Sequence, residues 1–180
     1  ETRHLKKYYP FKNGKTLKAL DDVSIAVTKG TIFGIVGESG CGKSTLGKCM
    51  MRLQEITEGS VIFQGEDISR KPPKKMKQTL SKMQMVFQDP FSSFNPKLKI
   101  SYSLREPCRI NGMSPVQTDD RIGELLNYIS LSENELNRFP HELSGGQLQR
   151  LAIARALLLS PEFIVADEPV SALDVSVQAQ

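Results

Sequence analysis

The segment 37–45 carries the clearest chemistry in the chain. It reads Gly37, Glu38, Ser39, Gly40, Cys41, Gly42, Lys43, Ser44 and Thr45, and it fits the pattern G-x-x-x-x-G-K-[ST]. Glycines at this spacing let successive backbone N–H groups turn inward, and a following helix adds the partial positive charge of its N-terminus. The pattern therefore predicts a phosphate-binding loop. We expect Lys43 to reach the β- and γ-phosphates of a nucleotide and the Ser44 hydroxyl to ligate Mg²⁺.

Two adjacent carboxylates, Asp167 and Glu168, form a second candidate site. They follow the apolar run 163–166, which indicates a buried strand that ends at an exposed edge. Ligands of open α/β sheets bind at that edge. We expect Asp167 to hold Mg²⁺, directly or through water, and Glu168 to orient or deprotonate an attacking water molecule. The competing interpretation is a pair of exposed loop acids.

The elements that must position these residues follow from periodicity. Alternating apolar and polar residues over 3–9 and about 17–28 predict two half-buried strands, joined by a turn at 12–15. The run 31–36 lies between glycines and predicts a fully buried strand before the phosphate-binding loop. Further strands are expected over 60–63, 83–87 and 163–166, and helices over 43–53 and 144–159. Strands that alternate with helices indicate an α/β fold.

The region 100–138 follows a different pattern. Strand-like alternation fades there, and helical spacing relates Ile122, Leu125, Leu126 and Ile129. We therefore expect a helical insertion between the two sets of strands.

Composition excludes several classes of protein. Among 180 residues, 39% are hydrophobic and 24% are charged, which is typical of a globular domain and not of a disordered, collagenous or coiled-coil chain. No apolar stretch approaches the ~18 residues of a membrane span, and three cysteines without metal-ligand spacing indicate reduced thiols.

Charge is divided unevenly along the chain. Residues 1–109 carry twenty basic and ten acidic side chains, whereas 110–180 carry four and ten. A basic half is typical of contact with nucleic acid, a membrane surface or a nucleotide, and the phosphate-binding loop favours the nucleotide. The span 69–82 alone holds six basic and no acidic residues, and it is interpreted as a solvated helix entry.

Three further motifs narrow the class of nucleotide-binding protein. The pentapeptide 143–147 reads Leu-Ser-Gly-Gly-Gln, Gln88 lies in Val-Phe-Gln-Asp-Pro, and residues 171–174 read Ser-Ala-Leu-Asp. In this order, with the two sites above, they resemble the signature, Q-loop and D-loop of ATP-binding cassette (ABC) ATPases over essentially the whole chain. Segments 95–96, 139–143 and 167–180 are similar to the oligopeptide/dipeptide/nickel importer group. Val170 and Ser171 resemble its second, F-type ATPase subunit more than the first.

The resemblance implies a particular architecture. It is a P-loop NTPase core, with a RecA-like sheet plus antiparallel N-terminal strands, and an inserted α-helical subdomain. The ABC domain would cover 1–180, with the core at 1–90 and 160–180 and the helical subdomain, including the signature, at 91–159. Members of the family carry a switch histidine on a strand beyond Asp174. We therefore expect a domain truncated at its C-terminus that hydrolyses ATP weakly or not at all by itself.

The resemblance also implies how the motifs share ATP. Such ATPases form a head-to-tail dimer, in which ATP lies between one subunit's phosphate-binding loop and the other's signature. The signature residues Ser144, Gly145, Gly146 and Gln147 open a helix, so they offer an anion-binding N-terminus to the γ-phosphate. An N-cap followed by flexible glycines is the alternative interpretation of the same residues.

Three further positions complete the implied site. Gln88 would reach Mg²⁺ or the attacking water, which makes it catalytic together with Lys43 and Glu168. Asp174 would run along the dimer interface, and Tyr9 would stack on adenine. A polar strand end, a helix N-cap and a core aromatic are the respective alternatives.

The implied function is an ATP-binding, ATP-hydrolysing subunit that powers import of oligopeptides, dipeptides or nickel. Its cofactors would be ATP and Mg²⁺. Its partners would be transmembrane permease subunits, a second ABC ATPase subunit and, indirectly, an extracytoplasmic solute-binding protein, with no nucleic acid. It would be peripheral on the cytoplasmic face of the cell membrane. A soluble ABC ATPase that acts on nucleic acid and an exporter-type ABC ATPase are the alternatives.

Overall fold

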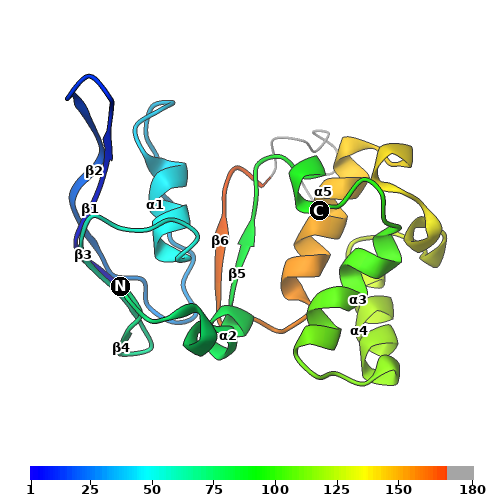
Figure 1. Cartoon of the computed structure of the whole chain (residues 1–180). Coiled ribbons are helices and arrows are strands. Elements are labelled where there is room, and N and C mark those ends of the chain that lie inside the picture. The colour runs from blue at the N-terminus through cyan, green and yellow to red at the C-terminus, as the bar shows by residue number, and fades with distance from the viewer. Residues whose placement is uncertain (170–180) are drawn as a thin grey trace. The chain divides into compact units, whose positions relative to one another are not determined.

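The computed structural model describes residues 1–169, which fall into two compact units, Glu1–Leu80 and the part of Ser81–Gln180 that is described. Each unit is presented by itself. Both the antiparallel N-terminal strands and the helical insertion expected from the sequence are present (Figure 1). Within residues 1–169, no helix combines the length and the apolar character needed to cross a bilayer.

The first unit is built on an antiparallel sheet. Strands β1 (Thr2–Pro10) and β2 (Thr16–Ile25) form a hairpin, and β3 (Glu58–Phe63) and β4 (Glu66–Asp67) extend it in the order β2-β1-β3-β4. The predicted turn closes the hairpin, where the Phe11 N–H donates to the Lys15 carbonyl at 2.8 Å. Irregular register between β1 and β2 bends the pair.

Two helices complete the first unit. Helix α1 (Lys43–Met50) lies beside the β1–β2 hairpin in Figure 1 and buries Leu46 and Cys49. It is shorter than predicted, because Arg52 adopts a left-handed backbone, φ 56°, that ends the helix. Helix α2 (Pro73–Lys82) begins with proline, whose fixed φ suits the first helical position.

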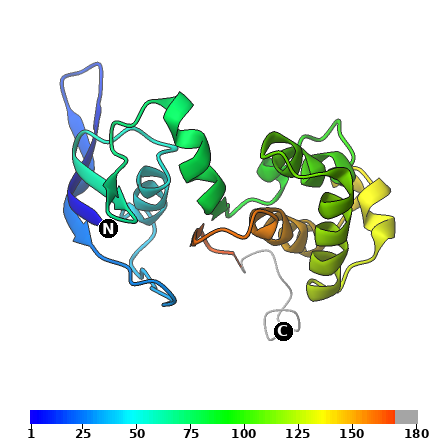
Figure 2. The same cartoon turned by 90° about the horizontal axis from the view of Figure 1, so that it is seen from below.

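The second unit combines a parallel strand pair with helices. Strand β5 (Met83–Val86) pairs in parallel with β6 (Phe163–Ala166), and α5 (Gly145–Leu157) packs against β5. Helices α3 (Ile100–Ile110) and α4 (Pro115–Tyr128) lie with α5 in one group, seen from below in Figure 2. Short 3₁₀ turns η1 (Phe91–Ser93), η2 (Glu133–Asn137) and η3 (Pro140–Glu142) connect them.

The core of the second unit confirms the helical spacing. Ile122, Leu125 and Leu126 are each only 3% exposed, and they pack with Leu104 and Leu148 in one apolar cluster. Burial of that stripe is what holds the helices together, at about 25 cal/mol per Å² of apolar surface.

Two expectations about strands are wrong. Residues 31–36 form no strand, and Ile32 and Val36 are almost fully exposed instead of buried. An apolar run becomes a buried strand only with hydrogen-bonded neighbours, and within residues 1–169 this run pairs with none. Strand β6 is present, but Ile164 on it is 40% exposed, so the strand is only half-buried.

Candidate functional site

The phosphate-binding loop leads directly into α1. Lys43 is the first residue of the helix, and Gly42 precedes it with a left-handed backbone, φ 101°. The Lys43 ammonium donates to the carbonyl oxygens of Gly37 and Glu38, both at 2.8 Å. The loop therefore curls around this cation, next to the first N–H groups of α1, which carry the positive end of the helix dipole. Positive charge and N–H donors at one point suit a phosphate group.

The remaining loop residues fit the same geometry. Gly40 has φ 81° and lies in the exposed part of the loop, whereas Ser44 and Thr45 belong to the first turn of α1. The Cys41 Sγ lies 3.9 Å from the Lys43 Nζ, and a Cβ added at Gly37 would stand 2.8 Å from that sulfur. Cys41 is thus an exposed side chain that packs closely against the backbone of Gly37.

The second group of residues gathers at the carboxyl end of β5 and β6. Parallel register pairs Val86 with Ala166, and the Asp167 N–H continues the ladder by donating to the Val86 carbonyl at 2.9 Å. One residue further, the Gln88 Nε2 donates to the Glu168 Oε2 at 2.6 Å. Residues eighty positions apart therefore share one edge.

The backbone of Glu168 reinforces this reading of the edge. Its φ is 46°, a conformation that non-glycine residues adopt at an energetic cost of about 1–3 kcal/mol. Such strained positions concentrate at functional sites.

Among residues 1–169, no group of three or more His, Cys, Asp and Glu side chains could hold a metal. A Mg²⁺ ion that keeps waters and binds phosphate oxygens needs only one or two protein ligands. The Asp167 carboxylate of the second unit and the Ser44 hydroxyl of the first are each ligands of that type.

The signature residues form a capped helix start. The Ser144 Oγ accepts from the Gln147 N–H at 3.2 Å, and the Gln147 Oε1 accepts from the Ser144 N–H at 3.0 Å. This capping box bears out the N-cap interpretation of Ser144. It leaves the N–H groups of Gly145 and Gly146 at the helix dipole, and a Cβ at Gly145 would meet nothing within 4 Å. The capping box and an anion-binding helix start are compatible.

Of the two remaining predicted residues, Tyr9 lies in the described part of the chain and Asp174 does not. The Tyr9 ring is half-buried on β1 and receives the Lys7 Nζ at 4.7 Å from its centre. Its neighbour Tyr8 is engaged elsewhere, since its hydroxyl donates to Asp21; this bond raises the pKa of Tyr8 and lowers that of Asp21. Asp174 lies outside the described residues, so its role stays a prediction.

Sequence reasoning missed Gln149. It is fully buried on α5, and neither its Oε1 nor its Nε2 has a hydrogen-bond partner in the described part of the chain. Its neighbours Leu148, Leu151 and Ala152 are all buried, but helical periodicity alone does not predict that Gln149 is buried with them.

Arg155 and Arg150 have structural roles. Arg155 donates to the carbonyls of Ser93 at 2.6 Å and Ser103 at 3.2 Å, and burial lowers its pKa. Arg150 donates to the Ile129 carbonyl at 2.9 Å.

The structure therefore brings Gln88, Asp167 and Glu168 together in the second unit. The phosphate-binding loop and Tyr9 belong to the first unit, and the signature lies at the start of α5 in the second.

Comparison with known proteins gives one consistent family. The family model described as "ABC transporter" matches residues 20–171. The chain is 49% identical to the oligopeptide transport ATP-binding protein OppF of Bacillus subtilis, over 100% of this chain and 60% of that protein. It is 48% identical to the oligopeptide transport ATP-binding protein AppF of the same organism, over 100% of this chain and 57% of that protein.

Solved structures agree with the sequence comparison. The chain is similar to the ATP-binding cassette MJ0796, in a dimeric post-hydrolysis state bound to ADP and Pi, with a TM-score of 0.90 and 31% identity. That match covers 99% of this chain and 77% of the other. The chain spans 55–60% of the length of OppF, AppF and a third Bacillus relative.

Proposed function

The chain belongs to the ABC transporter family, and from this premise we propose that it is the nucleotide-binding part of an ATPase that powers peptide import. The proposal that the protein hydrolyses ATP rests on one observation. The Gln88 amide lies 2.6 Å from the Glu168 carboxylate, next to Asp167, at the carboxyl edge of two parallel strands. In α/β sheets, this edge is where ligands bind.

Each residue has a role that its chemistry supports. Lys43 neutralises the β- and γ-phosphates, while Ser44 and Asp167 would hold the Mg²⁺ that screens phosphate charge when nucleotide is bound. Glu168 accepts the proton of the attacking water as general base, and the Gln88 amide fixes the carboxylate's orientation or positions that water. Tyr9 supports adenine by stacking.

The second half of the proposal concerns assembly. Two copies, or this chain and a related one, would meet head to tail so that Ser144, Gly146 and Gln147 face the γ-phosphate bound by the partner's loop. The free N–H groups at the start of α5 support this, because a helix N-terminus attracts an anion. Asp174 would run along the same interface. ATP then joins the two subunits, and hydrolysis separates them.

Peptide is the proposed cargo because OppF and AppF are both named oligopeptide transport proteins. Transmembrane permease subunits would carry the peptide, with a solute-binding protein outside the membrane, and the ATPase would be peripheral on the cytoplasmic face. Nickel is a second cargo of the same group. The nucleic-acid and exporter alternatives find no support in the relatives' names.

The test is uptake into membrane vesicles that contain the permease subunits and this ATPase. We expect ATP-dependent accumulation of a labelled oligopeptide, lost in Glu168→Gln. Glu162→Gln is the matched control, because Glu162 lies at the other end of β6 and pairs with Lys82 at 2.9 Å. Nickel accumulation without peptide would correct the cargo, and uptake by Glu168→Gln equal to wild type would reject the proposed mechanism.

A further inference from the structure

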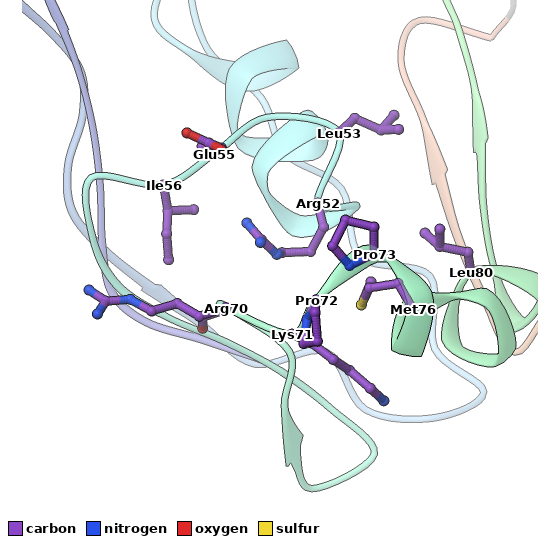
Figure 3. Close-up of a pocket in the computed structure, with 11 residues that line it drawn as sticks. Arg52, Leu53, Glu55, Ile56, Arg70, Lys71, Pro72, Pro73, Met76 and Leu80 are labelled. Carbon is purple, nitrogen blue, oxygen red and sulfur yellow. The ribbon is translucent and has the colours of Figure 1, made fainter.

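A cavity of about 520 Å³ opens in the first unit, at the end of α1 opposite the phosphate-binding loop (Figure 3). It lies between the segment that follows α1 and the start of α2. Its volume falls in the range of small-molecule sites, roughly 300–1,000 Å³. None of the residues assigned to nucleotide chemistry lines it.

The walls of the cavity are largely apolar. Leu53, Ile56, Met76 and Leu80 contribute side chains from both segments. Leu53 is 55% exposed and Leu80 is 37% exposed, so the apolar wall stays accessible to a ligand. Pro72 and Pro73 add rigid wall because their rings fix the backbone.

One cation enters the middle of this apolar lining. In Figure 3 the Arg52 side chain extends from the end of α1 toward the other lining residues. Its Nε donates to the Ile68 carbonyl at 3.0 Å, which fixes the plane of the guanidinium. Within residues 1–169, no hydrogen bond or ion pair involves its two terminal NH₂ groups. They form a fork of donors that is held in place, and its charge also acts on the nearby Asp67 carboxylate.

Charge around the cavity favours an anion. Arg70 stands at the rim, and its side chain extends outward in Figure 3, while Glu55 is the one acidic residue in the lining. Lys71 is already paired, with Glu66 at 2.8 Å and Thr79 Oγ1 at 3.1 Å. Lysines 74, 75 and 77 on α2 are exposed and do not line the cavity, so they contribute only general positive charge.

We propose that this cavity binds a small amphiphilic oxyanion, with a carboxylate or phosphate head on the Arg52 guanidinium and an apolar chain against Ile56, Met76 and Leu80. A planar guanidinium matches either head group with two parallel hydrogen bonds. The apolar wall supplies the remaining affinity by burying the chain from water. The nucleotide phosphates have their own cradle at the far end of α1, so the two ligands do not compete.

The test titrates three probes with the same eight-carbon chain into the full-length protein: octanoate, octyl phosphate and octanol. Methyl NMR signals of Ile56 and Met76 report where each probe binds. We expect both anions to shift these signals and octanol to bind at least tenfold more weakly. Whichever anion binds more tightly identifies the head group as carboxylate or phosphate.

Three variants distinguish a specific contact with the Arg52 guanidinium from a general effect of positive charge. Arg52→Gly removes the guanidinium and places glycine at a φ of 56° that glycine adopts freely, so the fold is expected to persist. We expect at least tenfold weaker binding of both anions. Arg70→Gln should weaken binding about threefold, because the side chain lies at the rim. Lys75→Gln makes the same change of charge on exposed α2 and should leave the affinity within twofold.

Octanol binding as tightly as the anions would overturn the proposal, as would unchanged affinity in Arg52→Gly. If Arg52→Gly unfolds, two other comparisons decide in its place. The proposal is rejected if octanol binds wild type as tightly as the anions and Arg70→Gln binds the anions as tightly as wild type does. ATP affinity, measured on the same samples, should stay within twofold of wild type. The proposed ATPase function and this cavity can therefore fail separately.

Discussion

Gly42 is the position in the phosphate-binding loop where the structure demands glycine most strictly. An added Cβ would stand 2.4 Å from the Ala19 carbonyl oxygen and 3.3 Å from Leu20 Cδ2. The first contact is with the backbone of β2, which is held by the hairpin and cannot rotate away as a side chain would. The φ of 101° is also strained for any other residue. Gly42→Ala therefore combines two penalties.

The magnitude follows from these two terms. The strained backbone contributes about 1–3 kcal/mol and forced displacement of packed atoms a similar amount. We expect Gly42→Ala to lower the free energy of unfolding by about 3 kcal/mol. In a protein of this size, roughly 2–4 °C of Tm accompanies each kcal/mol, so Tm should fall by roughly 6–12 °C. The assay is thermal and urea unfolding followed by circular dichroism.

Two matched glycines serve as controls. Gly40 has φ 81° but open space around its added Cβ, so Gly40→Ala carries only the strain, about 1–2 kcal/mol. Gly145 has neither feature, and Gly145→Ala should be neutral or stabilise by up to about 1 kcal/mol. Equal losses for Gly42→Ala and Gly40→Ala would refute the close approach of the loop to β2.

Three further predictions concern buried groups. Burial raises the pKa of Cys49, so the thiol of the unfolded chain loses its proton at a lower pH than the thiol of the folded protein. The free energy of unfolding should therefore fall as pH rises above about 9. Urea unfolding at several pH values measures this fall, which should be smaller in Cys49→Ala. Gln149→Met should raise the unfolding free energy by about 1–2 kcal/mol, because it removes two unpaired amide atoms; a loss would mean the amide is paired. Arg155→Met should lower it by about 2–3 kcal/mol, since it orphans the carbonyls of Ser93 and Ser103; an unchanged urea midpoint would contradict this.

The sequence was sufficient where local chemistry decides the structure. The order glycine, glycine, lysine, serine predicted that α1 begins at Lys43, and a positive φ at Gly42 is what that turn requires. The family resemblance, and not the strand pattern, placed Gln88 in one site with Glu168. The structure brings the two side chains together because each residue follows one of two parallel strands by two positions.

The sequence was insufficient where distant neighbours decide. Residues 31–36 have the composition of a buried strand, but a strand is made by the strands beside it, and no pattern within six residues contains that information. Gln149 is the opposite case, a polar residue that is buried where residues 31–36 are apolar and exposed. A polar side chain amid buried apolar residues became fully buried because α5 is covered on several faces, a tertiary property that helical periodicity alone does not give.

Hydrolysis of bound ATP by Glu168→Gln is the most direct test of the proposed mechanism, and it is measured in the assembled ATPase of which this chain is the proposed nucleotide-binding part. The substitution keeps the shape of the side chain, so ATP affinity should stay within about threefold of wild type, while single-turnover hydrolysis should fall by about 10²–10⁴-fold, the range a general base supplies. Lys43→Ala should instead lose ATP binding. Hydrolysis by Glu168→Gln within twofold of wild type would contradict the assignment of the carboxylate at the edge of β5 and β6 as the catalytic base.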